Sequence, residues 1–309
     1  MGFLSGFWKR AARGALKNHW LNALLIALAV NLPALLVQGI AAVTGNDLLT
    51  RLQDLLLSAV SANGTSLDTI RVTEGLQEIR ESTGIWVMQG LNIVAWLLTP
   101  CLTLGMVAWL LGRLRKQEDE GVIAVFSRMS LFLKGIGLRL YTAWRVFLFI
   151  LPGVALSILS LLPVWLNRGD SRISALNALN TSMGIQTVAM IAILVLGIMA
   201  ALKYALGDML LADHPEWGPV RAAKESKQAT QGKRGQLFSL YISFIPWYLL
   251  ETLVSGLCLD MFGPIPALMV QILGSLAITV YLNAAVCAFY LGNAAGEQEE
   301  INEESETEL

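Results

Sequence analysis

The chain has 309 residues, of which 55% are hydrophobic and only 15% are charged, whereas about a quarter of the residues in a soluble domain are charged. The formal net charge of −1 averages over segments of opposite charge, which are separated by long stretches without any charged residue. This composition excludes an ordinary soluble globular protein and indicates a chain that is largely embedded in a membrane.

Six apolar stretches are long enough to cross a bilayer, whose hydrocarbon core needs about 20 apolar helical residues. Five of them contain no Lys, Arg, Asp or Glu, and the remaining one, fifth along the chain, contains Glu251 alone. We therefore predict an all-α, polytopic integral membrane protein with one helical membrane domain over residues 1–296. The predicted transmembrane helices lie at about 20–42, 86–111, 146–166, 175–201, 236–258 and 265–291.

Two segments between the spans have amphipathic helical patterns. Residues 44–84 contain two such patterns in succession and predict an outer helical hairpin. Residues 121–133 have the pattern of an interfacial helix, because thirteen helical residues cover only about 20 Å and cannot form a seventh span. The apolar face of this second segment consists of Val122, Phe126, Met129 and Leu133.

The segment between the fourth and fifth spans is a third helical pattern, and it is basic. Its helix begins with a proline in the first turn and ends at Gly232. The predicted cytoplasmic basic surface consists of Arg221, Lys224, Lys227, Lys233 and Arg234. These cations either face anionic lipid headgroups or a protein partner, or they form a solvated helix that links two spans. After the last span, residues 297–309 carry seven Glu and no base, which predicts an acidic disordered tail.

The distribution of Lys and Arg predicts the orientation of the chain. Seventeen of them lie in the amino-terminal segment and in the segments after the second and fourth spans, and five lie in the alternate segments. Cytoplasmic loops carry the excess of Lys and Arg in membrane proteins. Both termini are therefore predicted to be cytoplasmic.

Residues 211–250, "LLADHPEWGPVRAAKESKQATQGKRGQLFSLYISFIPWYLL", contain a pattern that resembles the signature region of a bacterial membrane-protein family catalogued as domain of unknown function 975. The matching positions are Ala212, Asp213, Pro215, Ser226, Lys227, Gly232, Lys233, Ser243, Phe244, Ile245 and Trp247. His214, Arg234 and Pro246 depart from the family pattern. The resemblance extends over most of the chain and implies a helical multi-span fold in a bacterial cytoplasmic (inner) membrane. It implies no activity.

Motifs for catalysis or cofactor binding are missing from the sequence. Two histidines cannot form a His-rich metal site, and neither a phosphate-binding glycine loop nor a Gly-x-Ser-x-Gly nucleophile turn occurs. We therefore expect a protein that is not an enzyme, with no cofactor, no metal and no nucleic-acid partner. The partners that we expect are membrane lipids and a membrane or cytoplasmic protein.

Polar residues repeat at helical spacing in three spans. They include Asn31 and Gln38 in the first span, Gln89 and Asn92 in the second, and Gln271 and Asn283 in the sixth. Amide and small residues let membrane helices pack closely and form hydrogen bonds with one another. The stripes are therefore either packing contacts between helices or the lining of a polar pathway, and the sequence leaves both readings open.

Glu251 is the one acid inside a predicted span, and Pro246 precedes it by more than one helical turn. We expect the proline to kink the helix and to leave a backbone carbonyl without its helical partner. An acid inside the membrane is costly when ionised, so it faces the interior, extends to the headgroups or is protonated. By length, we place Glu251 about two turns from the outer end of its span. Arg168 and Arg172, in the next outer loop, are the cations that could reach it.

Two functions fit these observations. The first is a non-enzymatic scaffold, partner-regulating or self-protection protein, suggested by packing stripes, basic connectors and the acidic tail. The alternative is a transporter of a small solute or lipid with Glu251 in the pathway. The observation that separates them is a central cavity, because a polar cavity that reaches Glu251 favours transport and a solid bundle favours the scaffold.

Overall fold

The computed structural model describes residues 2–37, 83–117, 121–126, 128–166 and 172–307. Every regular element in this part of the chain is a helix, and no strand occurs in it. Six helices are long and apolar enough to cross a membrane. The all-α, polytopic membrane fold predicted from the sequence is therefore confirmed. The predicted outer hairpin lies outside the described residues, apart from its last two positions.

Five of the six described membrane segments extend beyond the predicted spans at one end or at both. The first is described from Trp20 to Val37, and we call it helix 20–37. The others are α4 (Thr83–Leu114), α5 (Phe132–Leu159), α7 (Arg172–Tyr204), the pair α10 (Arg234–Ile242) and α11 (Ile245–Phe262), and α12 (Pro264–Thr307). Shorter helices connect them: α1 (Gly2–Leu16), α6 (Leu162–Leu166), α8 (Gly207–Asp213) and α9 (Pro219–Ala229).

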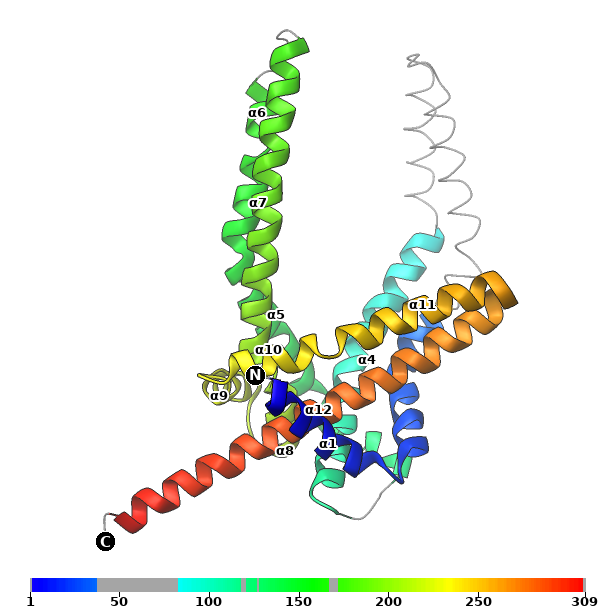
Figure 1. Cartoon of the computed structure of the whole chain (residues 1–309), viewed down its shortest axis with the longest axis vertical. Coiled ribbons are helices and arrows are strands. Elements are labelled where there is room, and N and C mark those ends of the chain that lie inside the picture. Colours follow the sequence, from blue (N-terminus) through cyan, green and yellow to red (C-terminus); the bar gives the residue numbers. More distant parts are fainter. Residues whose placement is uncertain (1, 38–82, 118–120, 127, 167–171, 308–309) are drawn as a thin grey trace.

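Three parts of the molecule extend from a common base (Figure 1). α5 and α7 form one long antiparallel pair, and α11 and α12 form another that points in a different direction. Helix 20–37 and α4 make up the third part. α8, α9 and α10 lie at the base, which we call the basic end.

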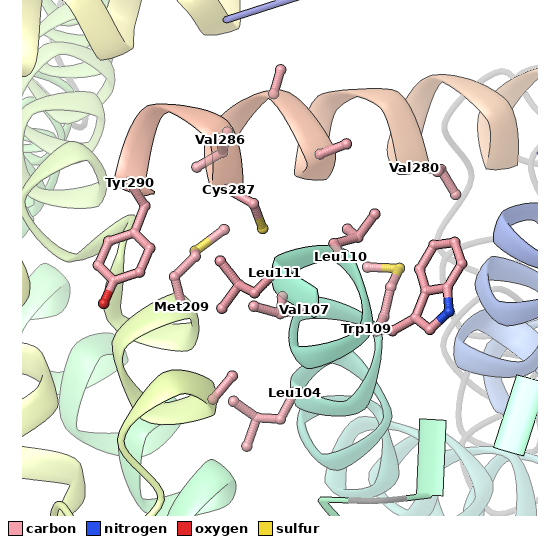
Figure 2. Close-up of a cluster of buried hydrophobic side chains, with 14 of the residues drawn as sticks. Leu104, Val107, Trp109, Leu110, Leu111, Met209, Val280, Val286, Cys287 and Tyr290 are labelled. Carbon is pink, nitrogen blue, oxygen red and sulfur yellow. The ribbon is translucent and has the colours of Figure 1, made fainter. Parts of the chain in front are cut away.

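The main hydrophobic core lies where α4 crosses α12 (Figure 2). Leu111 of α4 points toward Cys287 of α12 there, whereas Leu104 lies farther along α4, away from α12, and all three side chains are buried. About half of the apolar stretch of α4 is buried, against 6% of that of α5. α4 and α12 are therefore the central helices, and α5, α7 and α11 present their apolar side chains to lipid.

The third span starts earlier than predicted. The sequence places its first residue at 146, whereas α5 begins at Phe132 and includes Arg139 and Arg145. Charged residues are tolerated at the end of a membrane helix because their long side chains extend into the headgroup region. A rule that ends a span at the first charge therefore shortens the helix.

The predicted interfacial helix 121–133 is not an α-helix. Residues Gly121–Phe126 and Met129–Leu131 form two short 3-10 helices instead. The carbonyl group of Val125 lies directly against Gly105 of α4, where any larger residue would collide with it. This close approach holds the segment along α4, while the predicted apolar face, including Phe126, Met129 and Leu133, is exposed.

α12 continues through the acidic segment as far as Thr307. The sequence predicts a disordered tail from residue 297, but Glu and Gln have high helix propensity and extend a helix that is already formed. The prediction and the structure therefore differ in the backbone conformation of this segment. Its acidic sequence still offers no apolar face that could pack against another helix.

Candidate functional site

The fifth span is interrupted between α10 and α11. Trp247 donates its backbone N–H to Phe244 O, which is only three residues back, and Pro246 in the first turn of α11 has no N–H to donate. The carbonyl of Ser243 therefore lacks its helical partner. Lys9 of α1 supplies one, since its Nζ donates to Ser243 O at 3.0 Å.

Lys9 is held in a pocket of aromatic residues at this break. Its ammonium group lies 4.5 Å from the centre of the Phe244 ring, and Tyr281 of α12 donates its hydroxyl to the backbone carbonyl of Lys9 at 3.2 Å. Partial burial, together with the nearby charge of Arg13, lowers the pKa of Lys9. Three helices that are distant in sequence, α1, α10 and α12, meet at this one cation.

Glu251 lies deeper in the membrane helix than the sequence indicates. α11 continues to Phe262, so eleven residues, or about 17 Å at 1.5 Å per residue, separate Glu251 from the end of the helix. Glu251 therefore lies about three helical turns from the end of α11, rather than the two turns that the sequence indicates.

The side chain of Glu251 packs against α12. A methyl group added at Gly274 would lie 2.8 Å from Glu251 Cγ, so the glycine leaves the room that the carboxylate stem occupies. Oε1 of Glu251 is buried and has no hydrogen-bond partner among the described residues. Figure 1 shows the start of α7, which carries Arg172, far from α11, and Arg168 lies outside the described residues.

Glu251 lines a cavity of about 510 Å³ between helix 20–37, α11 and α12. Asn31 and Gln271, two of the amides that the sequence singles out, line it as well. The remaining lining residues are Ala34, Leu35, Leu268, Ile272, Ser275, Leu276 and Thr279. The stripes of the first and sixth spans therefore meet at the acid of the fifth.

The polar groups of this cavity include acceptors as well as donors. Asn31 donates one of its two amide protons to Ala27 O at 2.8 Å, and Ser275 donates its hydroxyl to Ile272 O at 3.0 Å. The oxygen atoms of both side chains remain as acceptors. Together with the carboxylate of Glu251, they favour a ligand that donates hydrogen bonds or carries positive charge.

The other polar candidates lie elsewhere. Gln89 and Asn92 are exposed on α4 and do not line this cavity. Asn283 donates to Thr279 O of its own helix at 2.8 Å, and Pro246 is exposed at the start of α11. Gln38 lies outside the described residues.

Some polar contacts of the spans do join helices. Ser160 donates to Gln186 Oε1 of α7 at 2.8 Å, and Ser255 of α11 donates to Ala267 O of α12 at 3.1 Å. Thr99 and Thr103 of the second stripe instead donate to carbonyls of α4 itself. Packing contacts and a cavity lining therefore both occur, and α11 and α12 take part in both.

A carboxylate at the basic end joins three helices. The carboxylate of Asp213, at the end of α8, accepts hydrogen bonds from both terminal nitrogens of Arg115 at 2.6 and 2.8 Å. It also accepts the hydroxyl of Tyr290 of α12 at 2.9 Å. Lys134 of α5 donates to the carbonyl of Pro215 in the following turn at 2.6 Å. We call Asp213, Arg115 and Tyr290 the Asp213 clasp.

α9 is fixed to its neighbours by one buried serine. Ser226 accepts the backbone N–H of Leu206 at 3.2 Å and donates to Lys203 O at 3.1 Å. Thr230 also donates to Lys203 O, at 3.4 Å. The carbonyl of Lys203, in the last turn of α7, therefore accepts hydrogen bonds from side chains in α9 and at its end rather than from water.

The residues of the predicted basic surface have different environments. Arg221 lies over the ring of Trp217, 4.6 Å from its centre, and this ring stacks on His214. Lys224 and Lys227 line a cavity together with cations of α5 and α7. Lys233 and Arg234 lie at the start of α10, where Arg234 borders the apolar residues of α7.

Six apolar helices joined by a polar base, with a carboxylate inside one span, define a polytopic helical membrane protein. The chain matches the family model described as "Protein of unknown function (DUF975)" over residues 8–295 and therefore belongs to that family. No curated protein and no solved structure matches it.

The positions that carry the family resemblance are concentrated in the contacts of the basic end. Asp213 forms the clasp, Ser226 fixes α9, and Ser243 and Phe244 hold Lys9. Lys9, Arg115 and Tyr290 are the partners that sequence reasoning missed. Asp213 and Ser243 were visible as motif positions, but nothing local to Lys9, Arg115 or Tyr290 marks them as partners.

Proposed function

We propose that this protein binds a small organic cation in the Glu251 cavity and carries it across the membrane. One observation carries the proposal: Glu251, whose buried Oε1 has no partner among the described residues, lines a cavity together with polar side chains of two other membrane helices. An ionisable group in that environment is costly, and such groups line substrate or ion pathways in membrane proteins. The proposed activity is transport without chemical conversion, and the protein is not an enzyme.

The chemistry of the cavity supports a cation with an apolar part. Glu251 provides a negative charge or an acceptor, and the side-chain oxygens of Asn31 and Ser275 provide further acceptors in the same lining. Leu35, Leu268 and Ile272 offer apolar walls. Its volume of about 510 Å³ falls within the range of roughly 300–1,000 Å³ that small-molecule sites occupy.

A scaffold that binds a protein partner is the second candidate function. It is favoured by the basic end, where Arg221 and Lys224 are exposed on α9 and remain accessible to a soluble partner. A scaffold does not need the cavity, so substitution of Glu251 separates the two functions.

The test of transport measures ligand binding and flux on purified, full-length protein. Butylammonium and butylguanidinium should raise the midpoint of thermal unfolding in detergent, whereas butanol and butyrate should not. Glu251→Gln keeps the shape of the side chain and removes its charge, so it should abolish the stabilisation while the protein still folds. Asp260→Asn, which changes an exposed acid of the same helix, is the control.

Flux decides between a transporter and a protein that only binds. Proteoliposomes that contain the protein should take up radiolabelled butylammonium, and those with Glu251→Gln should not. Equal stabilisation of the protein and of Glu251→Gln, or a complete lack of response to both cations, would refute the proposed site. Binding without uptake would leave the scaffold as the better function.

The proposed location is the bacterial cytoplasmic membrane, with both termini and the basic end in the cytoplasm. The division of Lys and Arg, 17 against five, supports this orientation. Single cysteines at Ser66 and Gln228, in a background without the three native cysteines, should react differently with an impermeant thiol reagent on intact cells. Labelling is expected at position 66. Labelling at position 228 and not at 66 would reverse the orientation.

A further inference from the structure

A second cavity, of about 490 Å³, lies at the basic end between α5, α7 and α9. It is lined by Tyr141, Arg145, Phe149, Lys203, Tyr204, Lys224, Lys227, Gln228 and Gln231. Four of these residues are cations and none is an acid. The Glu251 cavity is formed by other helices, so the two sites are separate.

Contacts within the structure hold the cations of this cavity in place. Arg145 donates its Nε to the hydroxyl of Tyr141 at 3.0 Å, which fixes the guanidinium on α5. Lys203 lies over the ring of Phe149, 3.7 Å from its centre. Lys224 and Lys227 are three residues apart and therefore lie on one face of α9.

The position of α9 is also fixed, because Ser226 is bonded to the backbone of Lys203 and Leu206. Three helices therefore bring like charges together around a hollow. Like charges at short range repel one another, and an anion between them removes the repulsion. Arg and Lys side chains that converge in this way bind phosphate groups through several charge-assisted hydrogen bonds.

We propose that this cavity binds the phosphate of an anionic phospholipid headgroup. The neighbouring surface supports a lipid rather than a free phosphate. Exposed apolar side chains of α5, among them Leu148 and Phe149, lie one turn beyond Arg145 along the helix. An acyl chain can lie against them while the phosphate stays among the cations.

The depth of the cavity agrees with the level of the headgroups. The 33 residues of α7 span about 50 Å, which is more than the ~30 Å hydrocarbon core, so the end of α7 that lines this cavity with Arg145 of α5 extends beyond that core. Lys203 is the second residue from the end of α7, on the same side. Basic pockets between membrane helices at this level are typical sites for anionic lipid headgroups.

The test measures lipid binding to the purified, full-length protein by native mass spectrometry from detergent that contains either phosphatidylglycerol or phosphatidylcholine. The protein should retain phosphatidylglycerol in preference to phosphatidylcholine. A charge near the membrane surface contributes about fivefold in affinity for anionic lipid, so Lys224→Gln/Lys227→Gln should lower the affinity for phosphatidylglycerol by about thirtyfold. Both side chains are exposed, so the double variant should fold.

Arg221→Gln is the matched control, because Arg221 lies on the same helix but outside the cavity. It should leave the preference for phosphatidylglycerol unchanged. Equal retention of the two lipids, or an equal loss of preference in the control, would overturn the proposal. Displacement of phosphatidylglycerol by millimolar inorganic phosphate, with equal protection of the protein against heat, would show that a free phosphate and not a lipid is the ligand.

Discussion

Replacing Asp213 with alanine should destabilise the protein more than replacing any other single polar residue of the basic end. Its carboxylate accepts three hydrogen bonds, two from Arg115 and one from Tyr290. Hydrogen bonds to charged groups contribute ~1.5–3 kcal/mol when buried, but exposed ion pairs contribute only ~0–1 kcal/mol. The side chain of Asp213 is 14% exposed and that of Arg115 is 41% exposed, so the clasp lies between these limits.

The expected losses in the free energy of unfolding follow from that exposure. Asp213→Ala should cost about 2–3 kcal/mol, because it removes all three bonds and leaves the hydroxyl of Tyr290 without an acceptor. Arg115→Ala should cost about 1 kcal/mol, because the guanidinium of Arg115 is partly exposed and water weakens its ion pair with Asp213. The coupling energy between the two positions should be about 1 kcal/mol in a double-mutant cycle.

The assay is reversible unfolding of the purified protein in mixed micelles, with Lys17→Ala, an exposed cation in the turn after α1, as the control. The pairing with Asp213 raises the pKa of Arg115. A raised pKa in the folded state stabilises the protein fully below the pKa of the unfolded state, and this stabilisation is lost only as the pH rises through the folded pKa, far above neutral pH. The contribution of Arg115 should therefore not change between pH 6 and pH 9. A coupling energy near zero, or a loss for Asp213→Ala no larger than that of the control, would refute the clasp.

Substitution of either Gly105 or Gly292 by alanine should destabilise the protein. Gly105→Ala would bring a methyl group to 2.6 Å from the carbonyl carbon of Val125, so we expect a loss of about 3 kcal/mol in the free energy of unfolding. The control is Gly90→Ala on the same helix, whose methyl group would meet nothing within 4 Å and should not destabilise the protein. Equal unfolding midpoints for the two variants would contradict the contact between Gly105 and Val125. Gly292→Ala would collide with the indole of Trp8, and a loss of about 1–2 kcal/mol is expected, which Trp8→Phe should partly restore. Without any such restoration in the double variant, the packing of α1 on α12 is described wrongly.

The membrane helices were predictable from the sequence because their signal is local. The length of a run of apolar residues can be read from the sequence, and each of the six runs is helical in the described residues, the fifth as the pair α10 and α11. The start of α5 was missed because Arg139 and Arg145 belong to a helix that continues beyond the hydrocarbon layer. The 3-10 segment was missed for another reason, since its geometry depends on how closely Val125 approaches Gly105.

The members of the cavity were predictable individually and not as a set. Asn31, Gln271 and Glu251 each stood out as polar residues in apolar runs. Gln89 and Asn92 have the same pattern, yet they lie on a part of α4 that does not border the cavity. Which polar stripes share a cavity depends on which helices are neighbours, and periodicity within one helix carries no information about that.

The contact between Lys9 and Ser243 has a consequence for how the chain is made. These residues are 234 positions apart, and α1 also rests on Tyr281, Phe289 and Gly292 of the last membrane helix. A ribosome synthesises α1 first and α12 last. α1 therefore cannot make most of its docking contacts until all the intervening spans have been inserted. Premature termination before α12 would leave α1 without most of its binding surface, whereas the α5–α7 pair would already be complete.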